Sequence, residues 1–393
     1  MRWGSAVSTA ASPEAAVDEV VSAVQAQLGG ARPDLAVVFA SEHHRQEYDR
    51  LPGLVRSRLT PGVLAGCSAG GVIGGGREIE GRPGLSLTAA LLPGVTLTPL
   101  HLENDQVPGA ADTPAAWAQL LRVRADARPH FLLLPDPFTF EAERLFAGLD
   151  GAFPTSTTVG GLASGGQAPG DNALFLGAET HRSGAVVVVL TGDIAVDTIV
   201  AQGCRPIGDP LFVTRCERNI IFELDGRRPF EVLQELVKRA DERDRALFRH
   251  SLFLGVVMKE QPEYRQGDFL IRNLAGIDPA SGAIAVGALP ELGAVVQFHL
   301  RDAETSRDDL EALLNRYSGE GRADRPAGAL LFSCLGRGMY LYGRPDHDTD
   351  AFHRHLGEIP LGGFFCNGEI GPVRGTTFLH GYTSAFGLFR SRG

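Results

Sequence analysis

Hydrophobic residues follow two different periods along the first part of the chain. From residue 13 to 28 they recur with helical spacing, between Ser12-Pro13 and Gly29-Gly30, and these flanking residues predict a helix. Residues 35–39 form a short β-branched run that predicts a buried strand. The same reasoning predicts a helix over 43–59, a strand over 63–65, a glycine-rich loop over 66–76, and an antiparallel strand pair over 85–92 and 95–102 joined by Pro93-Gly94.

This order of elements recurs later in the chain. Residues 131–190 again contain a strand, a helix, a strand, a glycine-rich segment and closing strands, and residues 329–389 contain them a third time. A fourth, degenerate copy is predicted over residues 252–300. The pattern indicates a repeated β-α-β-loop-β-β unit. Because adjacent strands are mostly antiparallel with helices alongside, the predicted class is α+β, as two α/β-sandwich-like halves with mostly antiparallel sheets.

Glycine is the one unusual feature of the composition. The chain has 49 glycines in 393 residues, about twice the usual share. Residues 66–71 align without a gap on residues 161–166, and residues 361–371 align on residues 64–74. The glycines therefore concentrate in corresponding loops, where tight turns need their conformational freedom.

The domain boundary is predicted near residues 203–225, a segment that carries no repeat and leads into a helix beginning at Pro229. The resulting organisation is an N-terminal helix in residues 1–30, a first domain in 31–225 and a second in 226–393.

Charge and cysteine content exclude several classes of protein. The net charge is −10 and no basic stripe is visible, so a nucleic-acid partner is not expected. No run of about 18 apolar residues and no signal-peptide pattern occurs, so we expect no membrane span. Five widely spaced cysteines without a C-x-x-C motif indicate a reducing compartment, and hence a cytoplasmic protein.

Two residues are candidate nucleophiles. Ser68 lies in Gly66-Cys67-Ser68-Ala69-Gly70, which matches the G-x-S-x-G nucleophile elbow, but the helix that an elbow requires does not follow. A tight glycine turn that contains a serine is the alternative. Cys334 follows a predicted strand and lies near Arg337, which can lower a thiol pKa, although a free cysteine is also typical of an inert core position.

Polar residues at the strand ends are candidates for binding a small ligand. The Arg337 guanidinium, between two glycines, can grip a carboxylate or phosphate, or can form a structural salt bridge. Asn367 and Glu369 lie on a glycine turn, where they can bind an amine or satisfy the turn itself. Since pockets form where strand ends face such loops, the candidate ligand-binding residues are Gly66, Cys67, Ser68, Asp136, Gly161, Cys334, Arg337, Asn367 and Glu369.

Metal-ligand residue types occur at residues 346–350 and in His353-Arg354-His355. Acidic residues before a helix are, however, the usual capping signal, and His353 and His355 do not share a helix face. We therefore assign no metal site.

Several of these motifs together resemble the FIST family of signal-transduction sensory modules. The N-terminal half resembles FIST-N through residues 65–71, Leu132–Pro137 and 159–163, and the C-terminal half resembles FIST-C through residues 333–338, 361–365 and 368–372. The resemblance spans roughly residues 30 to 390. It implies small-ligand sensing, with amino acids a frequent suggestion, and it implies no enzyme and no catalytic residue.

The resemblance also sets the alternatives. In related proteins the module is often fused to kinase, chemotaxis or cyclic-dinucleotide domains, whereas here the resemblance covers almost the whole chain. We therefore expect a stand-alone sensor whose signalling partner is a separate protein, such as a kinase or cyclic-dinucleotide enzyme. We expect its ligand to lie between the two halves. Some family members resemble haem-binding nitric-oxide sensors, which makes haem the candidate cofactor and His380 the nominated axial ligand, against a core or turn histidine. An acyl-transfer enzyme using Ser68 or Cys334 is the remaining alternative.

Overall fold

A computed structural model describes residues 1–109, 113–124, 126–320 and 325–392. It divides the chain into two compact units: a large unit of Met1–Val200, Ala312–Leu379 and Thr383–Gly393, and a barrel unit of Ala201–Glu311 and His380–Tyr382. The predicted α+β class and the predominance of antiparallel pairing are confirmed.

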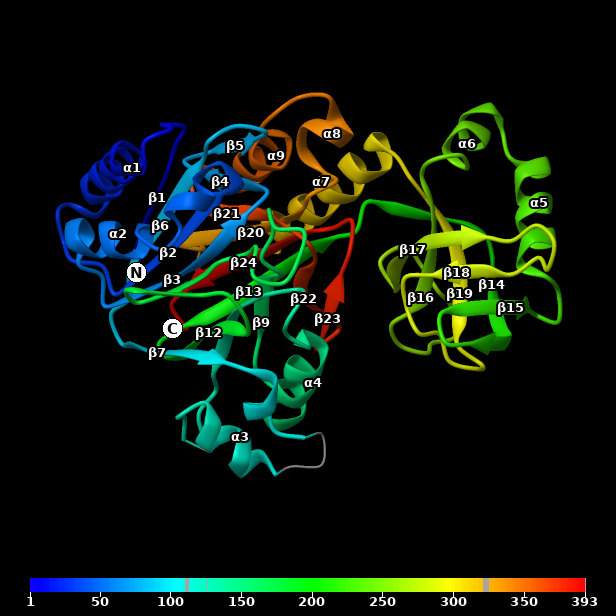
Figure 1. Cartoon of the computed structure of the whole chain (residues 1–393), viewed down its shortest axis with the longest axis horizontal. Helices are drawn as coiled ribbons and strands as arrows, with labels where there is room; N and C mark the ends of the chain where they lie inside the picture. The colour runs from blue at the N-terminus through cyan, green and yellow to red at the C-terminus, as the bar shows by residue number, and fades with distance from the viewer. Residues whose placement is uncertain (110–112, 125, 321–324, 393) are drawn as a thin grey trace. The chain divides into compact units, whose positions relative to one another are not determined.

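Within the described residues, the large unit contains three six-stranded sheets with one strand order (Figure 1). The first sheet runs β1 (Arg2–Ser8), β6 (Leu85–Leu91), β2 (Leu35–Ser41), β3 (Val63–Ala69), β10 (Leu174–Leu176), β11 (Glu179–His181). The second runs β7 (Val95–Leu102), β12 (Ala185–Gly192), β8 (His130–Pro135), β9 (Thr158–Gly161), β22 (Glu369–Val373), β23 (Thr376–His380). The third runs β13 (Ala195–Ala201), β24 (Ser384–Arg390), β20 (Gly328–Cys334), β21 (Leu361–Cys366), β4 (Gly71–Gly74), β5 (Arg77–Glu80).

The last two strands of each sheet come from a different copy of the repeating pattern. After β3 the chain leaves the first sheet, and the hairpin β4–β5 pairs with β21 of the third. After β9 the hairpin β10–β11 pairs with β3 of the first sheet, and after β21 the hairpin β22–β23 pairs with β9 of the second. Each copy then returns to its own sheet through β6, β12 or β24. The three hairpins are thus exchanged in a ring.

Each sheet also has one parallel pair, and a glycine sits at the same place in all three. Gly66, Gly160 and Gly363 face Val38, Leu133 and Leu331 on the neighbouring strand. A Cβ added at any of these glycines would lie 1.9 Å from the partner's carbonyl oxygen, so no other residue fits. Gly160 is therefore the counterpart of Gly66, and the predicted alignment of Gly66 with Gly161 is wrong by one residue.

Alternation along the strands divides the core into a shared centre and separate outer layers. In β2, Val37 and Phe39 belong to a cluster that also contains Leu132 of the second sheet and Phe332 of the third. The intervening Val38 faces the helices α1 (Pro13–Leu28) and α2 (Leu51–Leu59). The second sheet is covered on its outer face by α3 (Pro114–Leu120) and α4 (Ala142–Ala152), and the third by α9 (His347–Leu356), whose Phe352 stacks on Phe386 of β24. The short elements η1 (Glu42–Glu47), η2 (Asn104–Gln106) and α8 (Gly338–Tyr342) complete this unit.

The junctions that follow β3, β9 and β21, which contain the glycine-rich segments and are called the glycine loops, meet at Ser164. Its backbone N–H donates to Ser68 O at 3.2 Å, and its Oγ accepts from Gly70 N at 2.8 Å and donates to Phe365 O. Leu162 N also donates to Gly368 O at 2.9 Å. One buried serine of the second copy thereby joins the first and third copies.

The barrel unit begins at the last residue of β13 and includes the first part of α7 (Ala303–Gly319), up to Glu311. Its closed antiparallel barrel runs β14 (Cys204–Glu217), β15 (Ile220–Leu224), β18 (Ile284–Val286), β17 (Phe269–Ile277), β16 (Leu252–Val257), β19 (Val295–Arg301). Two helices, α5 (Pro229–Arg239) and α6 (Glu242–Leu247), belong to the same unit. The predicted fourth copy over 252–300 is wrong, since these residues form barrel strands without a parallel pair.

Other local predictions also differ from the structure. The predicted hairpin of residues 85–92 and 95–102 is wrong, because β6 pairs in the first sheet and β7 in the second. Residues 1–30 contain strand β1 as well as the predicted helix α1, whose Ser12 cap is confirmed by its bond from Ala15 N. The domain boundary at residues 225/226 stays a prediction, and the compact units divide the chain at Val200/Ala201 and Glu311/Ala312. Among the helices that the structure describes, none combines the length and apolar character needed to span a membrane.

The register glycines give a first prediction. Gly66→Ala, Gly160→Ala and Gly363→Ala should each lower the free energy of unfolding by more than about 3 kcal/mol, because the new methyl group forces two parallel strands apart. Gly53→Ala in α2 is the control, since a Cβ there meets nothing within 4 Å, and it should raise stability by up to about 1 kcal/mol. Urea unfolding measures all four. A mild effect at any register glycine would contradict the shared geometry.

Candidate ligand site

Several predicted ligand residues lie where the glycine loops meet, and their polar groups are already satisfied. Ser68 Oγ donates to Asn172 Oδ1 at 3.3 Å and accepts from Ala173 N at 3.1 Å. Asn172 Nδ2 donates to Asp136 Oδ1 at 2.9 Å, and Asp136 Oδ2 accepts from Thr139 Oγ1 at 2.7 Å. Ser68 is buried within β3 and is followed by β4. It is therefore not on a nucleophile elbow.

The other loop candidates also serve the fold. Gly66 and Gly161 are buried strand residues, and burial raises the pKa of the Cys67 thiol well above its ordinary value. The side chain of Asn367 is exposed, and its Nδ2 donates to Ala163 O at 3.3 Å. The structure brings these residues to one junction, which is held by direct hydrogen bonds between the loops.

Arg337 lies in a different place, in a fully buried ion pair. Its Nε and Nη2 donate to Asp348 Oδ2 and Oδ1 at 2.9 and 3.2 Å, and Nη2 also donates to the Tyr342 hydroxyl at 2.6 Å. Burial disfavours both charges, yet the Asp348 carboxylate raises the pKa of Arg337 and the guanidinium lowers the pKa of Asp348. The fork that was predicted to grip a ligand is thus occupied by Asp348, as in the salt-bridge alternative.

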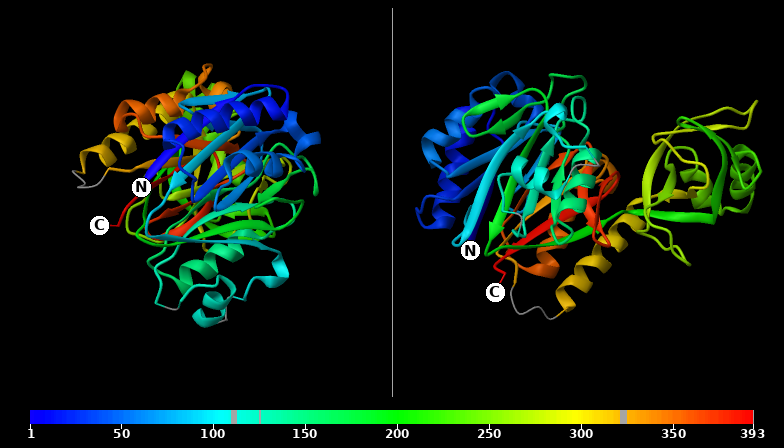
Figure 2. Two further views of the ribbon diagram at one scale, coloured as in Figure 1. Left: turned by 90° about the vertical axis from the view of Figure 1, so that its left-hand side faces the viewer. Right: turned by 90° about the horizontal axis from the view of Figure 1, so that it is seen from below.

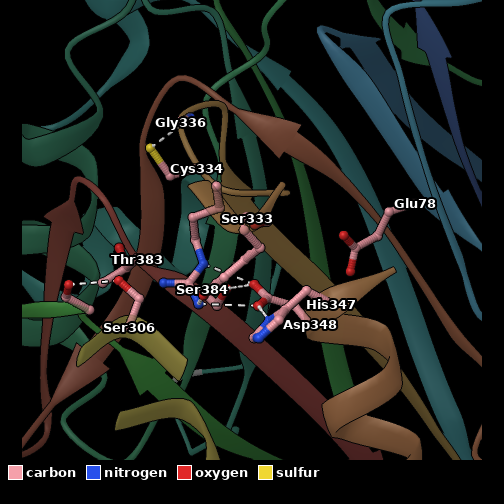
Figure 3. A network of polar contacts seen from close by, with 12 residues as sticks. Glu78, Ser306, Ser333, Cys334, Gly336, His347, Asp348, Thr383 and Ser384 are labelled. Carbon is pink, nitrogen blue, oxygen red and sulfur yellow. Dashed lines mark hydrogen bonds and ion pairs between the residues drawn. The ribbon is translucent and has the colours of Figure 1, made fainter. Parts of the chain in front are cut away.

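The ion pair continues into a buried polar network (Figure 3). His347 Nδ1 lies 3.0 Å from Asp348 Oδ1, and Ser384 Oγ donates to Asp348 Oδ2. The adjacent Thr383 donates its N–H to Glu369 Oε2 at 3.0 Å. Burial raises the pKa of Glu369 to about 7. The helix α9, strand β24 and the start of β22 are therefore linked through charged groups.

Two acidic residues tie the exchanged hairpin β4–β5 to α9. Glu78 Oε1 accepts from Thr349 N at 2.9 Å, and Glu78 N donates to Asp346 Oδ1 at 2.6 Å. Burial, followed by the nearby Asp348 carboxylate, raises the pKa of Glu78 to about 8. Figure 3 shows Glu78 across from His347 and Asp348. The segment 346–350, considered above for metal binding, thus serves this junction, and the described residues contain no metal-binding group of three or more His, Cys, Asp or Glu side chains.

The network still contains buried polar atoms without a hydrogen-bond partner among the described residues. They are Nη1 of Arg337, Oε2 of Glu78 and Oγ of Ser333. A buried donor or acceptor left in this state costs about 1–3 kcal/mol. A rearrangement or a bound water that satisfies them would therefore be favoured.

A cleft of about 260 Å³ opens beside this junction. The Gly75-Gly76 turn, α9 and the segment before β21 form its walls together with β1 and α1, and its lining residues are Ser5, Gln27, Gly75, Gly76, His353, Glu358, Ile359, Pro360 and Leu361. A Cβ at Gly76 would lie 3.2 Å from His353 Cε1, and Gly76 has a φ of +75°. Glycine thus keeps the space in front of His353 open.

The polar groups of the cleft differ in whether they already form hydrogen bonds within the protein. Gln27 is paired with the backbone of Ser5, with both bonds at 3.0 Å, and Ser5 Oγ donates to Leu361 O at 2.8 Å. His353 Nε2 lies 3.2 Å from Ile359 O. The Glu358 carboxylate is on an exposed residue at the rim. His353 and Glu358 are therefore the groups that can meet a ligand.

Haem does not fit this cleft. His380, the nominated axial ligand, is buried at the end of β23 and does not line it. The cleft is also smaller than a haem group, so the described site does not accommodate this cofactor.

Sequence patterns pointed to only part of the site. The segment 66–76, Arg337 and His353 were singled out, whereas Gln27, Glu78 and Glu358 belong to no motif. The sequence predicts only that Asp348 is one of the acidic residues that cap a helix, and no pattern in it indicates that Arg337 is the partner of Asp348. Gly76 and Glu78 reach α9 because the hairpin β4–β5 is exchanged into the third sheet.

The ion pair predicts a large effect of a single truncation. Arg337→Ala should lower the free energy of unfolding by about 3–5 kcal/mol, because it leaves the buried Asp348 carboxylate without its counter-charge. The control is Arg344→Ala, whose pair with Asp350 at 2.8 Å is about half exposed, and its effect should be about 1 kcal/mol or less. Equal losses in chemical denaturation would show that burial does not set the difference.

Glu78 predicts a pH-dependent stability difference. Its pKa is raised from 4.5 to about 8 in the folded protein, so the folded state binds this proton more tightly than the unfolded state. The resulting stabilisation is complete below pH 4.5 and is lost as the pH rises through about 8. Glu78→Gln should therefore gain stability relative to the native protein by more than about 1 kcal/mol between pH 5 and pH 9. A pH-independent difference in urea unfolding would refute this.

The chain matches two protein-family models and is similar over nearly its whole length to several known proteins. The FIST N domain matches residues 34–227 and the FIST C domain matches residues 229–372. The uncharacterized protein Rv0628c of Mycobacterium tuberculosis is 39% identical over 392 residues, which cover 99% of this chain and 100% of that one. The uncharacterized protein Mb0898c of Mycobacterium bovis is 38% identical, with 99% of each chain covered.

Two further similarities are more distant. An F-box/LRR-repeat protein of Arabidopsis thaliana, At5g63520, is 26% identical over 163 residues, covering 36% of this chain and 30% of that protein. The crystal structure of a cyanuric acid hydrolase from A. caulinodans aligns over 100% of this chain and 99% of that one, with 10% identity and a TM-score of 0.34.

FIST domains are associated with sensing in signal transduction and are not a known enzyme family. Both of their models match here, and together they cover nearly the whole chain. The chain belongs to the FIST family.

Proposed function

We propose that this protein is a cytoplasmic sensor that binds a small metabolite in the cleft beside the hairpin β4–β5. The observation that carries the proposal is the cleft itself, whose volume of about 260 Å³ suits a ligand of amino-acid size. Its lining combines polar groups with the apolar side chains of Ile359, Pro360 and Leu361. The five free thiols are consistent with a reducing, cytoplasmic setting.

The lining indicates the chemical class of ligand. Glu358 offers a carboxylate to an amino group, and His353, whose Nε2 lies 3.2 Å from Ile359 O, offers its other ring nitrogen, Nδ1, to a ligand. Ile359 and Pro360 offer apolar contact beside them. A small molecule with an amino group and a short apolar part, such as an amino acid, matches this arrangement.

Binding here would act on two structural elements at once. The hairpin carries both Gly76, in the cleft, and Glu78, in the buried network, and α9 carries both His353 and Asp348. A ligand that touches the hairpin turn and α9 therefore changes the relation between them. The unsatisfied groups on Arg337, Glu78 and Ser333 make a second arrangement of the network energetically accessible.

The signal can reach the surface through α8. Glu80 Oε1 accepts from Met339 N at 2.9 Å, so a movement of the hairpin would be transmitted to α8. Met339 and Tyr340 are 48% and 84% exposed. We propose that a separate signalling protein, such as a kinase or a cyclic-dinucleotide enzyme, contacts this exposed turn.

Ligand binding is tested by thermal unfolding and calorimetry with a panel of amino acids and related amines. At least one should raise the unfolding temperature progressively with concentration. Glu358→Gln should weaken binding of that compound roughly tenfold or more, since it removes the charge that pairs with the amine.

Glu141→Gln is the matched control, because Glu141 is also exposed but precedes α4, far from the lining residues in sequence and sheet. It should leave the affinity unchanged. A panel without any stabilising compound, or equal losses in the two variants, would reject the proposed site.

A further inference from the structure

Two cysteines lie side by side at the end of the third sheet. Cys334 ends β20 and Cys366 ends β21, and the two residues are partners in the parallel pairing of these strands. Neighbouring strands are about 4.8 Å apart, which is inside the 4.4–6.8 Å range of Cα separations found in disulfides. Backbone geometry therefore permits a bond between them.

Their side chains share one face of the sheet. Phe332 and Phe364 belong to the central core. Cys334 lies two residues after Phe332, and Cys366 lies two residues after Phe364. Because side chains along a strand return to the same face every second residue, both thiols lie on that face. Cys366 is itself part of this core cluster. Both cysteines are free thiols in the structure.

The two thiols have complementary surroundings. Cys334 is half-buried, its Sγ accepts from Gly336 N at 3.5 Å (Figure 3), and Leu335 next to it is 39% exposed. Cys366 is fully buried, and its Sγ lies 3.4 Å from Ser333 O and 3.5 Å from Glu369 Oε1, either of which can accept the thiol proton. Thr383 fixes the other oxygen of that carboxylate. An outside reagent can therefore reach Cys334, and Cys366 has a proton acceptor within contact.

The same positions in the other two copies carry no such pair. Three residues beyond the register glycines lie Ala69 and Ala163. The positions that correspond to Cys334 are Ser41, the last residue of β2, and Asp136, the residue that follows β8. The thiol pair is thus not required by the repeated fold, which forms without it twice in the same chain.

We propose that Cys334 and Cys366 form a reversible redox site that is oxidised to a disulfide by hydroperoxides, independently of the ligand cleft. The Cys334 thiolate attacks the terminal oxygen of the hydroperoxide, the O–O bond breaks, and an alcohol or water leaves with the thiol's proton. Cys334 is thereby oxidised to a sulfenic acid.

The buried thiol then resolves this intermediate. The sulfur of Cys366 attacks the sulfur of Cys334 while its proton passes to Glu369, and the sulfenic hydroxyl leaves as water after taking up a proton. The S–S bond forms, one hydroperoxide is reduced, and two thiols are oxidised. A dithiol reductant restores the starting state.

The test is peptide mapping of the reduced full chain after treatment with stoichiometric hydrogen peroxide. We expect one disulfide that links the peptides of Cys334 and Cys366 and disappears on reduction. Cys366→Ser should halt the reaction at a sulfenic acid on Cys334 that dimedone traps, and Glu369→Gln should prolong the life of that intermediate.

Cys216→Ser is the matched control, since Cys216 is also half-buried but lies in the barrel strand β14. It should leave the disulfide intact. Circular dichroism checks that each variant folds, and the map of the native chain decides the question without any variant. Absence of the Cys334–Cys366 link, or modification of Cys216 in preference to Cys334, would overturn the proposal.

Discussion

The exchange of β-hairpins among the three sheets is the constraint on which the rest of the large unit depends. The two strands at one edge of each sheet come from another copy, so none of the three sheets is complete without a neighbouring copy. The inner faces then close around one core shared by Phe39, Leu132 and Phe332. Since burial of that core is the main stabilising term, the copies must assemble together.

The exchange requires the chain to leave each sheet at the end of a parallel pair and to pass close to its neighbours. Gly66, Gly160 and Gly363 permit the close approach within the sheets, and Ser164 satisfies backbone groups of the other two copies where the loops meet. The high glycine content is explained partly by this packing and partly by turns such as Gly75-Gly76. The glycine loops therefore hold one another, and the cleft lies beside the hairpin that one of them leads into.

The same exchange creates the candidate site. It brings Glu78 of the first copy into hydrogen-bond contact with Asp346 and Thr349 of the third, near the Asp348 carboxylate that pairs with Arg337. A hairpin and a helix joined by buried charges respond together when either moves. The side chains at the corresponding positions of the three copies differ. They are Ser41 at the end of β2, Asp136 directly after β8, and Cys334 at the end of β20. The three copies share one backbone arrangement, and their functional groups differ from copy to copy.

The sequence by itself determined the class, several local elements and the family. Ser12, Pro13 and Gly29 delimit α1 through local hydrogen bonds, and the hydrophobic period identifies buried strands such as β2, because these signals act over a few residues. The motifs that resemble FIST domains span the chain, and family models match there. Only the tertiary structure decided that β6 and β7 separate into different sheets, that a barrel is inserted between β13 and β20 of the third sheet, and that Asp348 neutralises Arg337. The first two depend on contacts between residues distant in the chain, and the third joins residues 11 positions apart that no sequence pattern pairs. The energy of burying a strand face or a charge is set by its partner in space.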